Sequence, residues 1–178
     1  MDSWLVLGPT ALAAAGLLVL AGVPKVADPG DLVRALRTIG LRIHPLLVRG
    51  FALGEVVAGV AAIVLPSRPS LAVVALLHAG FTAFVLLALR SGGVVASCGC
   101  LGRADTPPTR AHAATTGLLA LAAGGLAVAA PVDPWWSAGT ASVVVTVLLA
   151  GFIGFLAWQV IAVLPSTTPA AVRSTGRA

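Results

Sequence analysis

Long apolar runs alternate with short polar links along the whole chain. A helix needs roughly 20 apolar residues to cross the hydrocarbon core of a bilayer. None of these runs shows the two-residue alternation that a membrane β-barrel strand requires. The pattern therefore predicts five transmembrane helices in one domain of residues 1–164, at about 4–23, 46–65, 71–89, 111–130 and 138–164. Residues 165–178 are small and polar, and we expect a disordered tail there.

The link after the first run carries a different pattern. Asp28 is a suitable N-cap residue, and Pro29 fits the first position of a helix. Leu32 and Leu36 follow at helical spacing, with arginines on the opposite face, and Gly40 is placed to end the helix. The link therefore predicts a short amphipathic helix that lies in the membrane interface.

Composition indicates which solvent surrounds the chain. Of the 178 residues, 58% are hydrophobic before the 20 glycines are counted, and 10% are charged. Soluble domains have about 25% charged residues. A soluble fold of this size cannot bury so much apolar surface, since small domains leave much of their surface exposed. A soluble enzyme, a nucleic-acid-binding domain and a disordered chain are therefore excluded, and the lipid bilayer is the expected surrounding.

The charges that remain give an orientation. The net charge of +5 comes from Lys and Arg residues that flank the apolar runs, and the most basic stretch has no aromatic residue for stacking on nucleic-acid bases. With five spans, the links 24–45 and 90–110 share one side with the C-terminal tail, and this side holds nearly all of the basic residues. The positive-inside rule then predicts a multi-pass cell-membrane protein with its N-terminus outside and its C-terminus inside.

Cys98 and Cys100 are the only two cysteines, and Gly99 separates them in a glycine-rich link after the third span. Two thiols at this spacing can close a strained disulfide, and strain makes such a bond easier to reduce. A nearby arginine such as Arg103 favours the thiolate. The same thiolates could instead bind a soft ion such as Cu(I) or Hg(II), or be incidental residues of a loop. Spacing alone leaves these three interpretations open.

Three further side chains are candidates for function. Glu55 lies in the middle of the second span, where a carboxylate needs a partner or a proton, and His78 lies within the third span. Counted from the hairpin between these spans, their depths differ by about 5 Å at 1.5 Å per residue. We therefore expect a Glu55–His78 contact or a shared water, which would serve either a proton or redox relay or a structural hydrogen bond. Lys25, at the end of the first span, is expected to extend its amine to the interface.

Other small and flanking residues have structural interpretations. Gly50 and Gly54 have the spacing that marks close packing between membrane helices. His44 and His112 flank spans, and we expect them to be hydrogen-bonded caps at the interface.

Several of these residues resemble the MauE family, which is grouped with DoxX-like membrane proteins. The resemblance covers four spans, roughly residues 10–130, and many relatives have Phe where this chain has Leu101. It rests on Ala21-Gly22-Val23-Pro24-Lys25, Asp28-Pro29, Gly54-Glu55 and Cys98-Gly99-Cys100-Leu101-Gly102.

The resemblance implies an all-α integral membrane protein with a four-helix DoxX-like core plus one helix, linked to thiol–disulfide chemistry. The family's namesake is associated with methylamine utilisation. It is thought to help mature or export the disulfide-rich small subunit of methylamine dehydrogenase, beside a thioredoxin-like partner. By resemblance, Cys98 and Cys100 form the redox pair, and Lys25 and Glu55 are buried charges. The sequence identifies no cofactor; a quinone is compatible with it, but no residue pattern derives one.

The resemblance and the charge pattern disagree about sidedness. Exchange with an exported client requires the thiols outside, whereas the charges place the link 90–110 inside. Either the link dips into the bundle, or insertion overrides the charge bias. The leading hypothesis is a thiol–disulfide relay or maturation factor with oxidoreductase activity. The alternatives are a soft-metal binding or transport protein and an accessory structural subunit, and no oligomeric state is predicted.

Overall fold

The computed structural model describes residues 3–38, 40–90, 109–129 and 133–164 of the chain. These residues form helices and turns without a strand. The helices are α1 (Ser3–Ala27), α2 (Gly30–Thr38), α3 (Pro45–Val64), α4 (Arg68–Arg90), α5 (Arg110–Ala129) and α6 (Thr140–Trp158), with a 3-10 turn η1 (Trp135–Ser137) and a π-helical turn η2 (Gln159–Val163).

Five helices are long and apolar enough to cross a membrane, namely α1, α3, α4, α5 and α6 with its extension η2. The predicted fold class, an all-α integral membrane bundle of five transmembrane helices, is therefore confirmed. The helix ends differ from the predicted ones by a few residues. The largest difference concerns α1, which continues beyond residue 23 and through Pro24 as far as Ala27.

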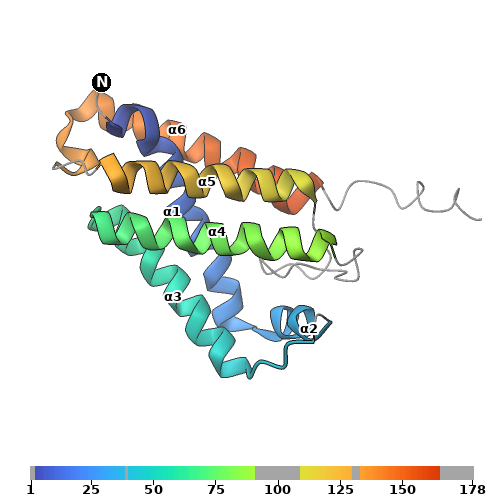
Figure 1. Ribbon diagram of the computed structural model, residues 1–178. Coiled ribbons are helices and arrows are strands. Elements are labelled where there is room, and N and C mark those ends of the chain that lie inside the picture. Colours follow the sequence, from blue (N-terminus) through green and yellow to red (C-terminus); the bar gives the residue numbers. More distant parts are fainter. Residues whose placement is uncertain (1–2, 39, 91–108, 130–132, 165–178) are drawn as a thin grey trace, which may run out of the picture.

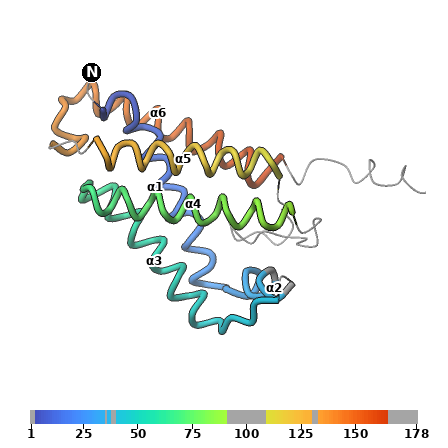
Figure 2. Tube along the Cα trace, viewed as in Figure 1, coloured from blue at the N-terminus to red at the C-terminus, as the bar shows by residue number. Residues whose placement is uncertain are grey.

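α1 is the central helix of the bundle. It packs against α3, α5 and α6, and more of its apolar window is buried than in any other span, 61% against 39% for α5. Its residues Ala14 and Leu18 pack in one cluster with Val74 of α4 and Leu126 of α5. Figures 1 and 2 show α1 passing behind α4 and α5 toward the end where α2 lies. Residues near the end of α1 are therefore held inside the bundle.

Close packing between α1 and α3 depends on two glycines. A Cβ on Gly59 would lie 2.5 Å from the carbonyl oxygen of Ala15, and one on Gly22 would lie 2.8 Å from the carbonyl oxygen of Ala52. Small residues allow membrane helices to approach closely, because van der Waals contact rather than hydrophobic burial drives their association. These two glycines let the α1 backbone lie directly against α3.

The predicted glycine pair is wrong for this bundle. Gly50 and Gly54 are exposed, and a Cβ on either would meet no atom within 4 Å. The spacing of two glycines shows that both lie on one face of the helix. It does not show whether a neighbouring helix packs against that face. In α3 the buried face carries Gly59 and Glu55 instead.

The amphipathic helix forms where the caps predict it. The Asp28 carboxylate accepts a hydrogen bond from the N–H of Gly30 at 2.8 Å. At the other end, Gly40 has φ +85°, its N–H bonds to the carbonyl of Arg37, and the N–H of Leu41 bonds to the carbonyl of Leu36. This is the left-handed glycine termination of a helix. It turns the chain back toward α3.

α3 ends and α4 begins at a hairpin, and the two helices diverge with distance from it. In Figure 1 they are adjacent where α4 begins and separate toward the end occupied by α2. α4 packs much more extensively against α5 than against α3. The divergence leaves a space between α3 and α4, which α2 and the end of α1 border.

The close approach of α1 and α3 gives a direct prediction. Gly59→Leu is expected to lower the free energy of unfolding by about 1–3 kcal/mol or more, because the new side chain meets backbone that cannot rotate away. Gly54→Leu on the same helix is the matched control and should have little effect. Unfolding in mixed detergent micelles measures both. Equal stability of the two variants would contradict the packing described here.

Candidate functional site

The main polar feature inside the bundle is an ion pair between α1 and α3. Lys25 Nζ lies 3.0 Å from Oε1 and 2.9 Å from Oε2 of Glu55, so the ammonium donates to both carboxylate oxygens. The two side chains are 2% and 0% exposed. In hydrocarbon an isolated charge is expensive, and intramembrane charges therefore pair with one another. Each side chain therefore compensates the charge of the other.

Lys25 does not extend to the interface as the sequence suggested. Cβ atoms in an α-helix point toward its N-terminus, so a lysine near the C-terminal end of a span is directed back into the membrane. α1 also continues to Ala27, which places Lys25 within the helix rather than after it. The signal that could have revealed the pair was present, since two opposite charges stood in neighbouring apolar spans.

An aromatic ring of α4 also contacts the ammonium. Lys25 Nζ lies 5.1 Å from the ring centroid of Phe81 on α4, within the range of a cation–π interaction. Phe81 also makes an edge contact with Phe51 of α3 at 6.4 Å between centroids. The pair therefore joins three helices, with α1 and α3 supplying the charges and α4 supplying the ring.

His78 does not pair with Glu55. Its Nδ1 bonds to the carbonyl oxygen of Val74, one turn earlier in α4, at 3.1 Å. Equal depth does not bring the two side chains together, because α3 and α4 diverge and His78 lies on the side of α4 near α1 and α5. Phe81 contacts the His78 ring, with 6.0 Å between the two centroids, and it also contacts the Lys25 ammonium. The expected Glu55–His78 contact is therefore replaced by Glu55–Lys25.

A second polar cluster lies between α4 and α5. His112 is 2% exposed, so it is not an interfacial cap as the sequence suggested, and Thr109 accepts the hydrogen bond from its N–H instead. His112 Nδ1 has no hydrogen-bond partner within the described residues. It borders a small cavity of about 30 Å³ together with His78 and Thr116. A volume of this size accommodates one water molecule.

Hydroxyl groups complete this cluster. The hydroxyl oxygens of Thr82 and Thr116 lie 2.8 Å apart, and Thr116 Oγ1 lies 3.1 Å from the carbonyl oxygen of His112. Sequence analysis did not find these threonines, because a single hydroxyl carries no motif. By contrast, the predicted capping role of His44 is confirmed, as its Nδ1 accepts from the N–H of Leu46 at 3.2 Å.

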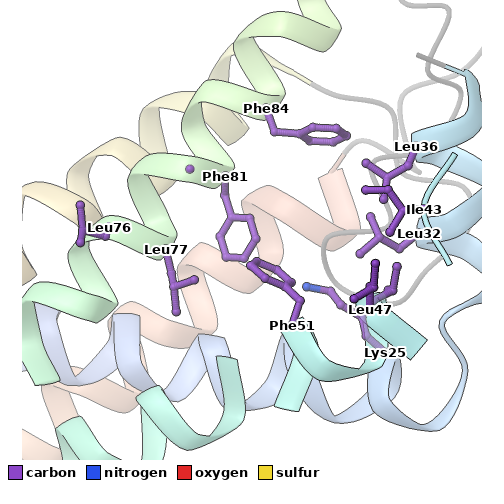
Figure 3. Close-up of a pocket in the computed structure, with 12 residues that line it drawn as sticks. Lys25, Leu32, Leu36, Ile43, Leu47, Phe51, Leu76, Leu77, Phe81 and Phe84 are labelled. Carbon is purple, nitrogen blue, oxygen red and sulfur yellow. The ribbon is translucent and has the colours of Figure 1, made fainter. Parts of the chain in front are cut away.

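A larger cavity adjoins the ion pair. Its volume is about 560 Å³, and Lys25 is its only charged lining residue among the described residues. Figure 3 shows the Lys25 amine directed toward the ring of Phe51, with Phe81 and Phe84 on one side and Leu32 and Leu36 of α2 on another. The apolar face of α2 thus covers one wall.

The predicted redox residues Cys98 and Cys100 lie outside the described residues, as do Arg103 and the predicted tail. Within the described part of the chain, no group of three or more His, Cys, Asp or Glu side chains is arranged to hold a metal ion. A soft-metal site on the two thiols therefore stays a sequence hypothesis.

The fold and the ion pair define a multi-pass membrane protein with a charged pair buried between its first two spans. The family model for methylamine utilisation protein MauE matches residues 2–130 of the chain. The protein therefore belongs to the MauE family. Comparisons with curated proteins and with solved structures give no match. The matched region includes both charges of the ion pair and both cysteines.

The ion pair can be tested by a double-mutant cycle. Removing one partner forces the other either to remain charged without compensation or to give up its charge, and breaking a buried pair in this way costs about 3–5 kcal/mol. Lys25→Met and Glu55→Met should therefore each destabilise strongly, while the combined variant should recover most of the loss. Unfolding of the purified variants in mixed micelles measures the coupling. Additive effects of the two substitutions would contradict a direct pair.

Proposed function

We propose that this protein is a membrane thiol–disulfide relay or maturation factor in which Cys98 and Cys100 cycle between dithiol and disulfide. The observation that carries the proposal is membership of the MauE family over residues 2–130, together with a closely spaced thiol pair as the only cysteines of the chain. The client is an exported protein that requires disulfides. In the family's namesake pathway that client is the methylamine dehydrogenase small subunit.

The chemistry is thiol–disulfide exchange. A thiolate of the partner attacks one sulfur of the Cys98–Cys100 disulfide and forms a mixed disulfide, and the second partner thiolate then resolves it. The partner becomes oxidised to a disulfide, and Cys98 and Cys100 become the dithiol. The reverse sequence carries electrons in the other direction. A thioredoxin-like protein is the proposed partner, since it presents the paired cysteines that this exchange needs.

The charge pattern places the cysteine link on the side opposite to an exported client, so this role requires that the thiols are reached through the bundle or that insertion overrides the charge bias. The link joins the end of α4 at Arg90 to the start of α5 at Arg110. In Figure 1 these two helix ends face the same end of the bundle as α2. By the charge rule this end is cytoplasmic, which gives a proposed orientation with the N-terminus outside. The ion pair and the cavity lie between this end and the middle of the bundle.

Single cysteine variants test the exchange. In the reverse direction the Cys98 thiolate attacks the disulfide of an oxidised partner, and Cys100 then resolves the mixed disulfide. In Cys100→Ser the mixed disulfide between Cys98 and the oxidised partner should therefore accumulate. Non-reducing gels of membranes would show it as a band that disappears on reduction, and Cys98→Ser tests the opposite assignment. The double variant, Cys98→Ser with Cys100→Ser, is the control. Unchanged client disulfide formation in the double variant would refute the proposal.

Sidedness has its own test. The chain has only two cysteines, so an alkylating reagent reports on them alone. The charge rule predicts that a membrane-impermeant maleimide labels them in opened cells and not in intact cells. Prior reduction is the control for thiols hidden in a disulfide. Full labelling in intact cells would reverse the proposed orientation and place the thiols on the side of exported clients.

A further inference from the structure

The cavity beside the ion pair has an apolar rim. Its rim carries large apolar side chains that the bundle leaves exposed, Leu47 at 67%, Phe51 at 46% and Leu76 at 71%. In a membrane-spanning helix such side chains contact lipid tails. The volume of about 560 Å³ lies within the range of about 300–1,000 Å³ typical of small-molecule sites. A ligand of this cavity therefore enters from the membrane and carries a hydrocarbon part.

One polar group is available to orient such a ligand. The Lys25 ammonium has three N–H donors, and within the described residues its hydrogen bonds run only to the two oxygens of Glu55. One donor is therefore left at the wall of the cavity. A hydrogen-bond acceptor placed there would gain strength from the low dielectric of the site. The ligand therefore carries an acceptor at its buried end.

The charge of that acceptor follows from the ion pair. Lys25 and Glu55 together have no net charge, and both carboxylate oxygens already receive the ammonium. An anionic head group would place a second negative charge beside Glu55 without a second cation among the lining residues. Uncompensated charge in an apolar site is costly. A neutral carbonyl accepts the free N–H without that cost.

Aromatic walls indicate the shape of the head group. Phe51, Phe81 and Phe84 face the cavity from α3 and α4, and Figure 3 shows their rings around the space in front of the Lys25 amine. Rings of this kind favour offset or edge contacts with another planar ring. The open backbone at Gly80 widens the same wall, since a Cβ there would meet no atom within 4 Å.

We propose that this cavity binds a lipid-soluble quinone, with one quinone carbonyl accepting a hydrogen bond from Lys25 and the hydrocarbon tail leaving between α3 and α4. The neutral carbonyl matches the neutral ion pair, the planar ring matches the phenylalanines, and the tail matches the leucine rim. The binding itself does not involve Cys98 or Cys100.

A redox consequence follows, and it rests on the function proposed above. The thiols of Cys98 and Cys100 lose two protons and two electrons as their sulfur–sulfur bond forms, and the quinone takes up both to become the quinol. The quinone then serves as oxidant, and electrons flow from client thiols toward the membrane. Binding and electron transfer can be measured separately.

The binding test uses full-length protein in quinone-free nanodiscs and decylubiquinone as the probe. A ligand that binds the folded state raises the unfolding temperature as its concentration increases. We expect saturable stabilisation by decylubiquinone and little by decylbenzene, which lacks the carbonyls, or by oleate, which carries a charge. Equal stabilisation by decylbenzene, or stronger stabilisation by oleate, would overturn the quinone assignment.

Gly80→Leu tests the location. The new side chain should fill the cavity without displacing the ion pair and should weaken decylubiquinone binding by about tenfold or more. Gly54→Leu is the matched control, because Gly54 is also exposed and open but does not line the cavity. Equal affinity of the two variants would overturn the site. The Lys25→Met/Glu55→Met variant should bind decylubiquinone no better than decylbenzene.

The cysteine-free variant separates the two proposals. Cys98→Ser with Cys100→Ser should bind decylubiquinone with unchanged affinity and should fail to reduce it in the presence of a dithiol. Absence of binding in every protein refutes the quinone site and leaves thiol exchange standing. Binding without any cysteine-dependent reduction refutes the quinone as oxidant of Cys98 and Cys100 and leaves the site standing, while the cysteine variants described above test the relay itself.

Discussion

The buried ion pair between Lys25 and Glu55 organises this membrane bundle. The side chains of Lys25 and Glu55 are 2% and 0% exposed, so surrounding water cannot compensate their charges and each is stabilised chiefly by the other. The pair fixes the end of α1 against the middle of α3. The glycines at 22 and 59 make this possible by letting the two backbones approach. Phe81 then brings α4 to the same point.

The same constraint shapes the cavity. Since α1 and α3 are held together at Lys25 and Glu55, while α4 packs mainly on α5, the α3–α4 hairpin opens toward α2. The space that results has apolar walls and one ammonium at its wall. Replacing a buried ion pair with apolar residues of similar volume is often neutral or stabilising, so stability alone does not require the pair. Retaining it beside a cavity that faces lipid is consistent with a binding role.

Much of the fold was predictable because lipid imposes simple rules. The five spans follow from length and apolar content, and α2 follows from Asp28 and Gly40, whose capping roles are local. Which face of each span points inward was not predictable. The side of a span that faces lipid and the side that faces another helix are equally apolar, because lipid tails are as apolar as leucine, so hydrophobicity does not distinguish them. For this reason the spacing of Gly50 and Gly54 predicts a close approach that Gly59 makes instead.

The sequence identified the residues of the site, but it did not identify which of them contact one another. Glu55 and Lys25 stood out as charges in or beside apolar runs, and both are buried. Depth along a span can be counted from sequence, but the lateral direction of a side chain cannot. Glu55 was therefore assigned to His78, at a similar depth, instead of Lys25. The buried position of His112 was missed for a related reason, since three residues into α5 it looks like a flanking residue.

The central claim is that Glu55 is ionised inside the membrane because Lys25 faces it. Isotope-edited infrared spectroscopy of the full-length protein in nanodiscs, with labelled glutamate, reports the protonation state of this carboxyl directly, since Glu55 is the chain's single glutamate. The account predicts the two stretching bands of a carboxylate in the native protein, and their replacement by the carbonyl band of a protonated acid in Lys25→Met. A protonated Glu55 in the native protein, or carboxylate bands that persist without Lys25, would contradict it.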